Sequence, residues 1–373
     1  DGLAVGQLSG ATNSARELAV VLPRGRADSG AVAVISNSCQ ELARYSSPSG
    51  RQQLGFPLVQ DLNGSPALSE YVVGEGLSAA NQGAVLARAG DSSAYWSSMP
   101  WGYPGYWNMG PSGAAVGVGT GVNTVFADWD GHLAVVGNAS TAIAAQTDFW
   151  ASDAEHPFGH VALANVIGSS ALEAVAWGYA KGTVTAFTGS TLAKAWQSAS
   201  LKSLYGDYAY GSGPAVGDID GDGNPEVVVA SYGSTADVYA FDPKNQPSGS
   251  TCKYRFNPGG RFTYTSPAIG DVDGSGRNSV VVISSSDSVV SVMKAPTTTG
   301  CTAGGTIVWQ YTIKAGEGSS FSPLLYDVNG DGTLDVIAAS QTRVVVLDVR
   351  NRTPLAYFDD STATFSPSGV VVL

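Results

Sequence analysis

The sequence predicts an all-β protein, a single seven-bladed β-propeller of four-stranded blades that spans residues 1–373. Three observations predict this fold. A nine-residue acidic loop occurs more than once, similar short apolar segments recur about every 50 residues, and 47 of the residues are glycine. Glycine together with many valines, serines and threonines favours short strands and tight turns over helices. A supersecondary unit that recurs at this period is typical of repeat architectures.

The acidic loop is most complete at residues 218–226, where oxygen-bearing side chains stand at positions 1, 3, 5 and 9 with glycines between them. The pattern returns in full at residues 327–335 and in reduced form at residues 271–275. Carboxylates spaced so closely indicate a backbone curled around a hard cation, and Ca²⁺ prefers oxygen ligands. We therefore expect calcium loops between the first two strands of some blades.

The loops also mark the register of a repeat. A similar short segment precedes the marks at residues 7, 61, 118, 165, 218, 271 and 327, as in Pro214–Gly217 and Pro267–Gly270. The spacings are 54, 57, 47, 53, 53 and 56 residues, and the step from 327 across the chain ends to 7 is 53. Seven units of one kind therefore fill the chain.

Further apolar segments predict the other strands of each unit. A second strand such as Glu226–Ala230 follows the loop, and a third such as Val238–Phe241 or Val344–Leu347 follows the second. Four short strands in a unit of this size are typical of a propeller blade, and closing the blades into a ring leaves only short sheet edges. The fourth strands are expected to carry aromatic residues of the core: Tyr45, Trp96, Phe149, Trp196, Tyr254, Trp309 and Tyr357.

The two ends of the chain compete for one position in this scheme. Residues 365–373 resemble the start of a first strand, although residues 3–8 already supply that strand for the first blade. We expect one end to close the ring beside the other, and the sequence leaves open which strand pairs with which.

Composition and charge bound the function. Apolar residues make up 43% of the chain, enough for a large core, yet no segment reaches the roughly 18 apolar residues of a membrane-spanning helix. The net charge of −12, with only 19 basic residues, argues against a nucleic-acid partner. Charged residues are scarce and the sequence begins at Asp1 without a methionine, so we expect a processed, secreted protein.

The three cysteines fit the repeat. Cys252 and Cys301 are 49 residues apart, close to one repeat, and so fall in comparable parts of adjacent units. We expect a disulfide between them and a free, buried thiol at Cys39. The alternative is three reduced cysteines in the core.

Loops of the form Asp-x-Asp-x-Asp-Gly-x-x-Asp/Glu between the first two strands of a blade resemble the FG-GAP/VCBS repeats of the integrin-α type. The resemblance extends over the whole chain and is strongest from Gly213 to Asp359. It implies a β-propeller with bound calcium. The family includes cell-adhesion heads, fungal lectins and polysaccharide lyases that act on uronate- or rhamnose-containing glycans, so the resemblance leaves the function open.

In each complete loop, four side chains are expected to give oxygen ligands to Ca²⁺ and the seventh residue a backbone carbonyl. The ligands are Asp218, Asp220, Asp222 and Glu226 with the carbonyl of Asn224, and Asp327, Asn329, Asp331 and Asp335 with that of Thr333. The reduced loop offers a weaker site of Asp271, Asp273 and Ser275. The ions either staple the first two strands together, which we favour, or act as a sensor or a bridge to a ligand.

Three loops from a fourth strand to the next first strand are rich in aromatic residues and histidines, and such loops surround the mouth of the channel opposite the calcium loops. Flat aromatic faces with polar neighbours suit sugar rings or a partner surface. The candidate ligand-binding residues are Trp101, Tyr103, Tyr106, Trp107, Tyr208 and Tyr210. The alternative is that these rings plug the channel or cover a blade. Trp177 and Tyr179, which follow a second strand, either face the same mouth or pack.

A catalytic role needs a base, a cation that neutralises a uronate carboxylate, and an acid for the leaving oxygen. His160, Tyr208 or Tyr210, with Arg261, are the candidates for such a lyase, and the alternative is that they are ordinary solvated side chains. We therefore expect a secreted, calcium-stabilised β-propeller that binds carbohydrate or a cell-surface partner through the aromatic loops. The alternative function is a polysaccharide lyase that works by β-elimination.

Overall fold

The fold is described from a computed structural model. It describes residues 161–360 apart from 170, 190 and 303, and, before them, residues 3–6, 8, 17–22, 31–36, 38–46, 51–53, 58–60, 69–77, 84–89, 99–100, 108–116, 122–128, 131–137 and 143–155. The chain divides into two compact units. The first comprises Asp1–Leu163, Thr188–Ala193 and Leu373, and the second comprises Ala164–Phe187 and Lys194–Val372.

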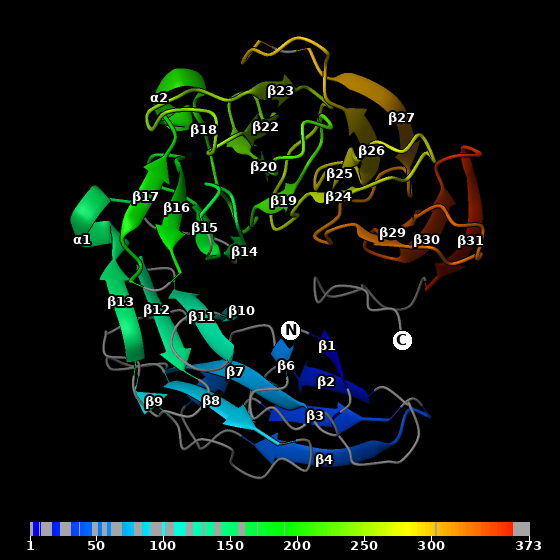
Figure 1. Ribbon diagram of the computed structural model, residues 1–373. Coiled ribbons are helices and arrows are strands. Elements are labelled where there is room, and N and C mark those ends of the chain that lie inside the picture. The colour runs from blue at the N-terminus through cyan, green and yellow to red at the C-terminus, as the bar shows by residue number, and fades with distance from the viewer. Residues whose placement is uncertain are drawn as a thin grey trace. The chain divides into compact units, whose positions relative to one another are not determined.

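The first unit contains three antiparallel sheets (Figure 1). The strands are β1 (Leu3–Gly6), β2 (Glu17–Leu22), β3 (Ala31–Ile35) and β4 (Glu41–Ser46), then β5 (Arg51–Gln53), β6 (Leu58–Gln60), β7 (Glu70–Leu77), β8 (Ala84–Arg88) and β9 (Met99–Pro100), then β10 (Asn108–Val116), β11 (Val122–Asp128), β12 (His132–Gly137) and β13 (Ile143–Asp148). The short helix α1 (Phe149–Asp153) follows. Buried apolar side chains of the first two sheets, including Val32, Val34 and Val73, form one core.

The second unit contains four more four-stranded sheets and one short helix. Strand β14 lies at its boundary in the sequence. The elements are β14 (Ala162–Ala164), β15 (Glu173–Trp177), β16 (Val184–Thr188) and β17 (Lys194–Gln197); β19 (Ala215–Gly217), β20 (Glu226–Ala230), β22 (Val238–Phe241) and β23 (Tyr254–Phe256); β24 (Ala268–Gly270), β25 (Ser279–Ile283), β26 (Val289–Lys294) and β27 (Thr306–Thr312); β28 (Leu324–Tyr326), β29 (Asp335–Ala339), β30 (Arg343–Asp348) and β31 (Thr353–Asp359); and α2 (Leu201–Tyr205). A small ribbon pairs β18 (Asp207–Tyr208) with β21 (Tyr232–Gly233).

The prediction of seven four-stranded blades is wrong in its count. Among the described residues six sheets have four strands, and the second repeat forms a five-stranded sheet instead. There the long strand β7 pairs with two short segments, residues 70–72 with β6 and residues 75–77 with β5. Two segments therefore occupy the place of one first strand.

The core of the second unit lies between successive sheets. Apolar residues on both faces of the middle strands are buried, and β20, β25 and β29 are buried along their whole length. Val228 of β20 and Val280 of β25 share one core, while Val281 of β25 and Val336 of β29 share the next. Strands buried on both faces explain the continuous apolar runs from which the second strands were predicted.

The aromatic residues predicted for the fourth strands have different environments. Trp196 and Tyr254 are buried on β17 and β23, which confirms their core role, while Phe149 is buried but begins α1 instead of lying in a strand. Trp309 is half-buried. The prediction is wrong for Tyr357, which is 64% exposed, because all seven residues of the outermost strand β31 are exposed. Trp96 lies outside the described residues.

The cysteines confirm one prediction and correct another. A disulfide joins Cys252 and Cys301, as predicted. Cys39 is a free thiol but is exposed instead of buried. It occupies the turn between β3 and β4 with φ of 61°, so it belongs to neither strand and its side chain lies outside the core.

The disulfide holds a loop of one repeat against the sheet before it. The amide of Gly300 donates to the carbonyl oxygen of Lys253 at 2.8 Å, and the amides of Gly304 and Gly305 donate to the carbonyl oxygen of Arg255 at 3.2 and 3.3 Å. These bonds cover the outer edge of β23, which removes acceptors that an exposed edge strand offers to other chains. Gly305 is required because a Cβ there would lie 1.9 Å from the ring of Phe256.

No helix among the described residues is both long and apolar enough to cross a membrane. Residues 365–373, a candidate for closing the ring, lie outside the described part of the chain.

Candidate functional site

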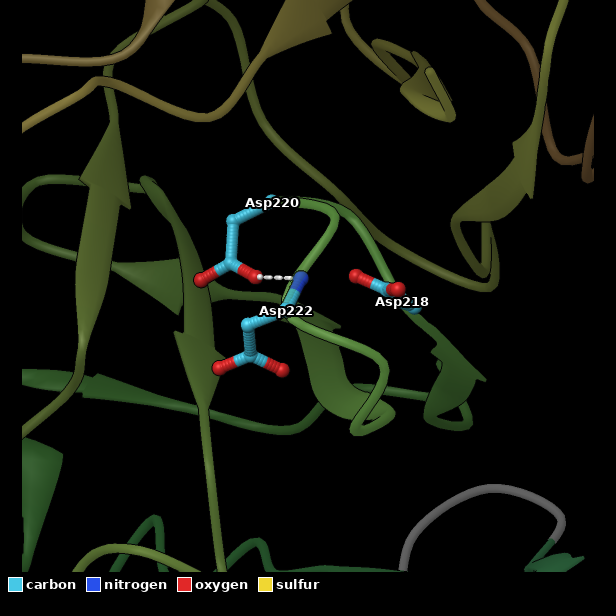
Figure 2. Close-up of side chains that lie close together, drawn as sticks. All are labelled: Asp218, Asp220 and Asp222. Atoms are coloured by element: carbon cyan, nitrogen blue, oxygen red, sulfur yellow. Dashed lines mark hydrogen bonds between the residues drawn. The ribbon is translucent and has the colours of Figure 1, made fainter. Parts of the chain in front are cut away.

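The loop at residues 218–226 is shaped by its own side chains. The carboxylate of Asp218 accepts hydrogen bonds from the amides of Gly221 at 2.6 Å and Gly223 at 2.9 Å. The carboxylate of Asp220 accepts one from the amide of Asp222 at 3.1 Å (Figure 2). Gly221 and Gly223 both have φ of +83°, which other residues rarely adopt. The loop therefore turns its carboxylates inward.

The other two loops repeat this geometry. At the seventh repeat the carboxylate of Asp327 accepts from the amides of Gly330 at 2.7 Å and Gly332 at 2.9 Å. At the sixth, Asp271 accepts from Ser275 at 3.1 Å and Gly276 at 2.8 Å. The reduced loop thus keeps the backbone form of the complete ones, although it has fewer acidic groups.

The acid at the ninth position has a structural task that sequence reasoning missed. One oxygen of Glu226 accepts the amide of Ile219 at 3.0 Å, and one oxygen of Asp335 accepts that of Val328 at 2.9 Å. In repeats whose loops lack the other acids, Glu173 accepts from Val166 at 2.9 Å, and Glu17 accepts from Leu8 at 2.7 Å. A buried acid at the start of the second strand, recurring through the sequence, is the signal that identifies this bond.

The loop at residues 218–226 belongs to the fifth repeat, and we call it the fifth loop; the loops at residues 271–275 and 327–335 are the sixth and seventh. The residues of the fifth loop fit a hard divalent cation. Carboxylate oxygens of Asp218, Asp220 and Asp222 lie within 4.8 Å of one another, and so do those of Asp222, Glu226 and Asp242. Asp242, directly after β22, was not predicted from the sequence. Clustered carboxylate oxygens are the donor set that Ca²⁺ prefers.

The fifth loop also holds a basic side chain. The ammonium of Lys253 bonds to carboxylates of the loop, and although burial opposes the shift, these bonds raise the pKa of Lys253. Burial alone would raise the pKa of Asp220, but hydrogen bonds from Lys253 and Tyr254 hold this pKa below its usual value. Burial raises the pKa of Glu226 to about 7.

A cluster of five tyrosines lies elsewhere in the second unit, and we call it the tyrosine cluster. Its members are Tyr179, Tyr208, Tyr210, Tyr232 and Tyr264. Tyr208 lies edge-on to Tyr179 at 5.3 Å between ring centroids and to Tyr232 at 5.6 Å. Tyr210 lies 5.1 Å from Tyr232 and 5.7 Å from Tyr264. Four of the rings are half-buried, and Tyr264 is 43% exposed.

Two cations flank the tyrosine cluster. The ammonium of Lys202 lies 4.5 Å from the ring centroid of Tyr208, and the guanidinium of Arg261 lies 5.8 Å from that of Tyr232. Cations over aromatic faces are attracted by the ring quadrupole. The surface therefore combines ring faces, phenol hydroxyls and positive charge in a protein whose net charge is −12.

The small ribbon of β18 and β21 holds the centre of this cluster. Tyr208 and Tyr232 are opposite residues in the ribbon, and Asp207 is opposite Gly233. Gly233 has φ of +147°, and a Cβ there would lie 2.2 Å from the carbonyl oxygen of Gly206. Only glycine therefore permits this pairing.

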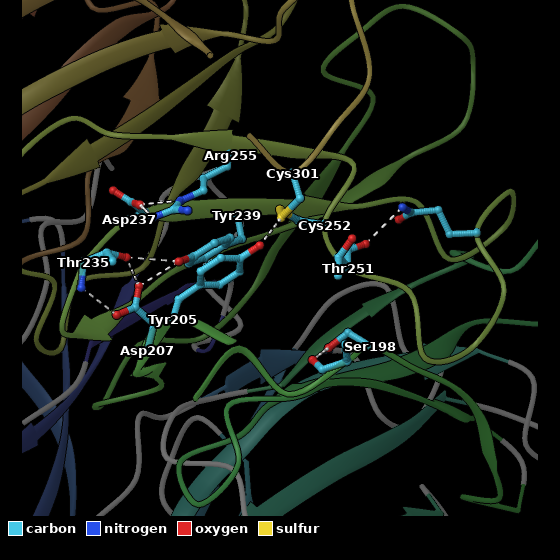
Figure 3. Close-up of a disulfide and its surroundings, with 12 residues drawn as sticks. Ser198, Tyr205, Asp207, Thr235, Asp237, Tyr239, Thr251, Cys252, Arg255 and Cys301 are labelled. Carbon is cyan, nitrogen blue, oxygen red and sulfur yellow. Dashed lines mark hydrogen bonds and ion pairs between the residues drawn. A yellow bond between two sulfur atoms is a disulfide. The ribbon is translucent and has the colours of Figure 1, made fainter. Parts of the chain in front are cut away.

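Asp207 is the buried anchor of the ribbon (Figure 3). Its carboxylate accepts hydrogen bonds from the hydroxyl of Tyr239 at 2.8 Å, the hydroxyl of Ser231 at 3.0 Å and the amide of Thr235 at 2.9 Å. Burial raises the pKa of Tyr239, so its hydroxyl keeps the proton that it donates. Because Tyr208 follows Asp207 directly in the chain, these bonds also hold Tyr208 in position.

The structure brings some of the aromatic residues considered in the sequence together, buries another in the core, and does not describe the rest. It brings Tyr208 and Tyr210 together, and it adds Tyr232 and Tyr264, which sequence reasoning did not single out. Tyr179 belongs to the cluster, whereas Trp177 is buried in the core. The remaining aromatic candidates, Trp101, Tyr103, Tyr106 and Trp107, and the candidate base His160 lie outside the described residues.

The electrostatics of the tyrosine cluster bear on the lyase hypothesis. Burial, with the neighbouring tyrosines, raises the pKa of Tyr208, and burial also raises the pKa of Tyr264. Tyr208 therefore keeps its proton near neutral pH, which suits a hydrogen-bonding group better than a general base. Arg261 is exposed beside Tyr232.

The antiparallel four-stranded sheets, each formed by strands close in sequence, are the blades of a β-propeller. Solved structures agree. BamB from Moraxella catarrhalis matches 99% of this chain and 92% of its own at a TM-score of 0.60 and 13% identity. The V. cholerae biofilm matrix protein Bap1 matches 99% and 81% at 0.61 and 13%, and the Dos1 propeller matches 94% and 82% at 0.58 and 12%. At such identities the likeness concerns the fold alone.

The sequence itself gives more specific information about the family of its repeats. Residues 218–282 match the model of the FG-GAP-like repeat, so this β-propeller carries a repeat of the FG-GAP-like family. This part of the chain contains the fifth loop and the start of the sixth repeat, whose motifs suggested the resemblance. A search of curated proteins found no relative of the sequence.

Proposed function

We propose that this protein is a secreted, calcium-stabilised binding module that holds carbohydrate on the tyrosine cluster. The observation that carries the proposal is the contact of five tyrosine rings around Tyr208 and Tyr210, flanked by Lys202 and Arg261. Ring faces suit the C–H faces of sugars, and protonated phenols and basic side chains suit their hydroxyl and carboxylate groups. Tyrosine also loses little conformational entropy on binding.

Secretion is supported by the disulfide between Cys252 and Cys301, because such bonds persist in oxidising compartments. Calcium is supported by the convergent carboxylates of the fifth loop and by the seventh loop, whose backbone has the same form. In this proposal the ions hold loops and strands together, while the tyrosine cluster binds the ligand.

Replacing Tyr264 by alanine tests the binding site. Tyr264 is the most exposed ring of the cluster, so we expect the variant to fold normally and to bind glycans at least about tenfold more weakly, as for a contact worth more than 1.4 kcal/mol. Binding is measured on a glycan array with neutral and acidic glycans and then by titration of the strongest ligand. The matched control is Tyr357→Ala, which removes an exposed tyrosine from β31.

Equal losses in both variants, or no glycan binding by the unaltered protein, contradict carbohydrate binding at this surface. Retained binding to a cell surface stripped of glycans points to a protein partner instead. The raised pKa of Tyr208 disfavours this residue as the base of a lyase, and the candidate base His160 lies outside the described residues. Unsaturated uronate products, detected by ultraviolet absorbance with acidic polysaccharides, would restore that alternative.

Chelation tests the calcium part of the proposal. At a free Ca²⁺ concentration about 100 times the dissociation constant, each occupied site stabilises the folded protein by about 2.7 kcal/mol. We therefore expect excess EDTA to lower the thermal unfolding midpoint, and added Ca²⁺ but not Na⁺ to restore it. An unchanged midpoint in EDTA would show that the loops are stable without a divalent ion.

A further inference from the structure

The fifth loop already contains a cation, the ammonium of Lys253. Its Nζ lies 2.7 Å from a carboxylate oxygen of Asp220, 3.0 Å from one of Asp222 and 2.8 Å from one of Glu226. It also lies 2.9 Å from an oxygen of Asp242. The side chain of Lys253 is only 10% exposed. Three of these carboxylates belong to the residues predicted to bind calcium.

The sixth loop has a lysine in a comparable role. The Nζ of Lys294 lies 3.0 Å from a carboxylate oxygen of Asp273 and 2.9 Å from the hydroxyl oxygen of Ser275. Lys294 follows Met293, which is paired with Val280 in the sheet. The basic group thus approaches the loop from the end of the third strand.

The same register position carries an acid in the two complete repeats. Asp242 follows Phe241, the partner of Val227, and Asp348 follows Leu347, the partner of Val336. Both acids accept hydrogen bonds from an asparagine three residues later, Asn245 and Asn351. The fifth and seventh repeats therefore share this acid and its asparagine. They differ because the fifth loop also contacts a lysine, Lys253.

The seventh loop has no such counterion in the described part of the chain. There, no lysine or arginine lies within 4.0 Å of a carboxylate oxygen of Asp327, Asp331, Asp335 or Asp348. Arg350 reaches this loop through the hydroxyl of Thr333, at 3.3 Å. Among the described residues, the acidic groups of the seventh loop are thus not paired directly with a basic side chain, in contrast to those of the fifth loop.

We propose that Lys253 is the built-in cation of the fifth loop, so that a divalent ion binds the seventh loop first and enters the fifth only when the lysine side chain withdraws. Like charges a few ångströms apart repel strongly in a half-buried site, so ammonium and Ca²⁺ compete for the same oxygens. The backbone of Lys253 is fixed by its amide, which donates to Ala240 at 2.7 Å, and by the disulfide at Cys252. Withdrawal is therefore confined to the side chain.

The inference rests on the proposed calcium sites and is tested by calorimetric titration of metal-free protein with Ca²⁺ alone. For the unaltered protein we expect one tight site and a second, weaker one. In Lys253→Met the weaker site should tighten at least about tenfold, or 1.4 kcal/mol. The metal-free variant should also melt at a lower temperature than the unaltered protein and recover more on addition of Ca²⁺.

Lys244→Met is the matched control, because Lys244 bonds to the side-chain oxygen of Asn224 on the same loop and has no ion pair with its carboxylates among the described contacts. It should leave both sites unchanged. Asp331→Asn assigns the sites, since it should weaken the tight site of the unaltered protein and spare the site gained in Lys253→Met.

Two unfavourable outcomes are distinguishable. Calcium binding that is identical in the unaltered protein and Lys253→Met overturns the role of Lys253 and leaves the proposed calcium sites intact. Absence of binding in the unaltered protein and in Lys253→Met overturns both. Binding that appears only in Lys253→Met supports the role of the lysine but overturns the seventh loop as the first site.

Discussion

Replacing Asp207 by alanine is expected to lower the free energy of unfolding by at least about 3 kcal/mol and to abolish ligand binding at the tyrosine cluster. The substitution removes the charged acceptor of the hydroxyls of Ser231 and Tyr239 and of the amide of Thr235. The two hydroxyls keep only neutral partners, the carbonyl oxygen of Asp237 and the hydroxyl of Thr235. Hydrogen bonds to a charged acceptor are stronger than those to neutral groups, and here several donors lose one charged acceptor at once. The loss is measured from the urea midpoint and slope.

The control for this prediction is Asp287→Ala, which removes an exposed carboxylate between β25 and β26. That change should alter the free energy of unfolding by less than about 0.5 kcal/mol. Asp207→Asn keeps the shape of the side chain but replaces one acceptor oxygen by a donor amide group. Its loss in free energy of unfolding should lie between those of Asp207→Ala and Asp287→Ala. If Asp207→Ala were as stable as the control, the hydrogen bonds around Asp207 would not position the ribbon.

Removing the disulfide by Cys252→Ser with Cys301→Ser should destabilise the protein by about 4 kcal/mol, since the bond closes a loop of about 49 residues. The effect comes mainly from the larger freedom of the unfolded chain. The loop that covers β23 should also loosen, and hydrogen exchange at Gly300 and Gly305 should accelerate.

Reduction distinguishes this effect from damage caused by the serines. A thiol reductant should lower the unfolding midpoint of the unaltered protein to that of the double variant and leave the double variant unchanged. Cys39→Ser, which removes the exposed free thiol, should behave like the unaltered protein. A reductant effect of equal size in the double variant would mean that the bond is not the source of the stability.

Sequence reasoning worked where one pattern determined the structure. The strands Glu226–Ala230 and Val238–Phe241 have the predicted bounds, because a continuous apolar run between glycine-rich turns has few other solutions. The split first strand of the second repeat was not predictable in this way. Its segment β5 reads Arg51, Gln52 and Gln53 and has no apolar pattern.

The candidate site was harder to predict because its contacts cross repeats. Tyr208 and Tyr210 stand out as a local cluster in a glycine-rich loop, but Tyr232 and Tyr264 reach them from other loops, and no local pattern indicates this. The role of Lys253 was hidden for the same reason, since it lies 27 residues from Glu226. Periodicity identifies faces and turns, but it does not identify which loops meet.

The buried acid at the start of the second strand gives the loop a backbone bond that does not involve a metal. Glu173 accepts the amide of Val166 in a loop that lacks the other acids, and Glu226 and Asp335 make the same bond in loops that have them. The acids at the other loop positions can thus vary one at a time while this bond remains. Loops of this kind are evolvable parts and, for an engineer, positions where metal affinity can be installed on a backbone that is already shaped for it.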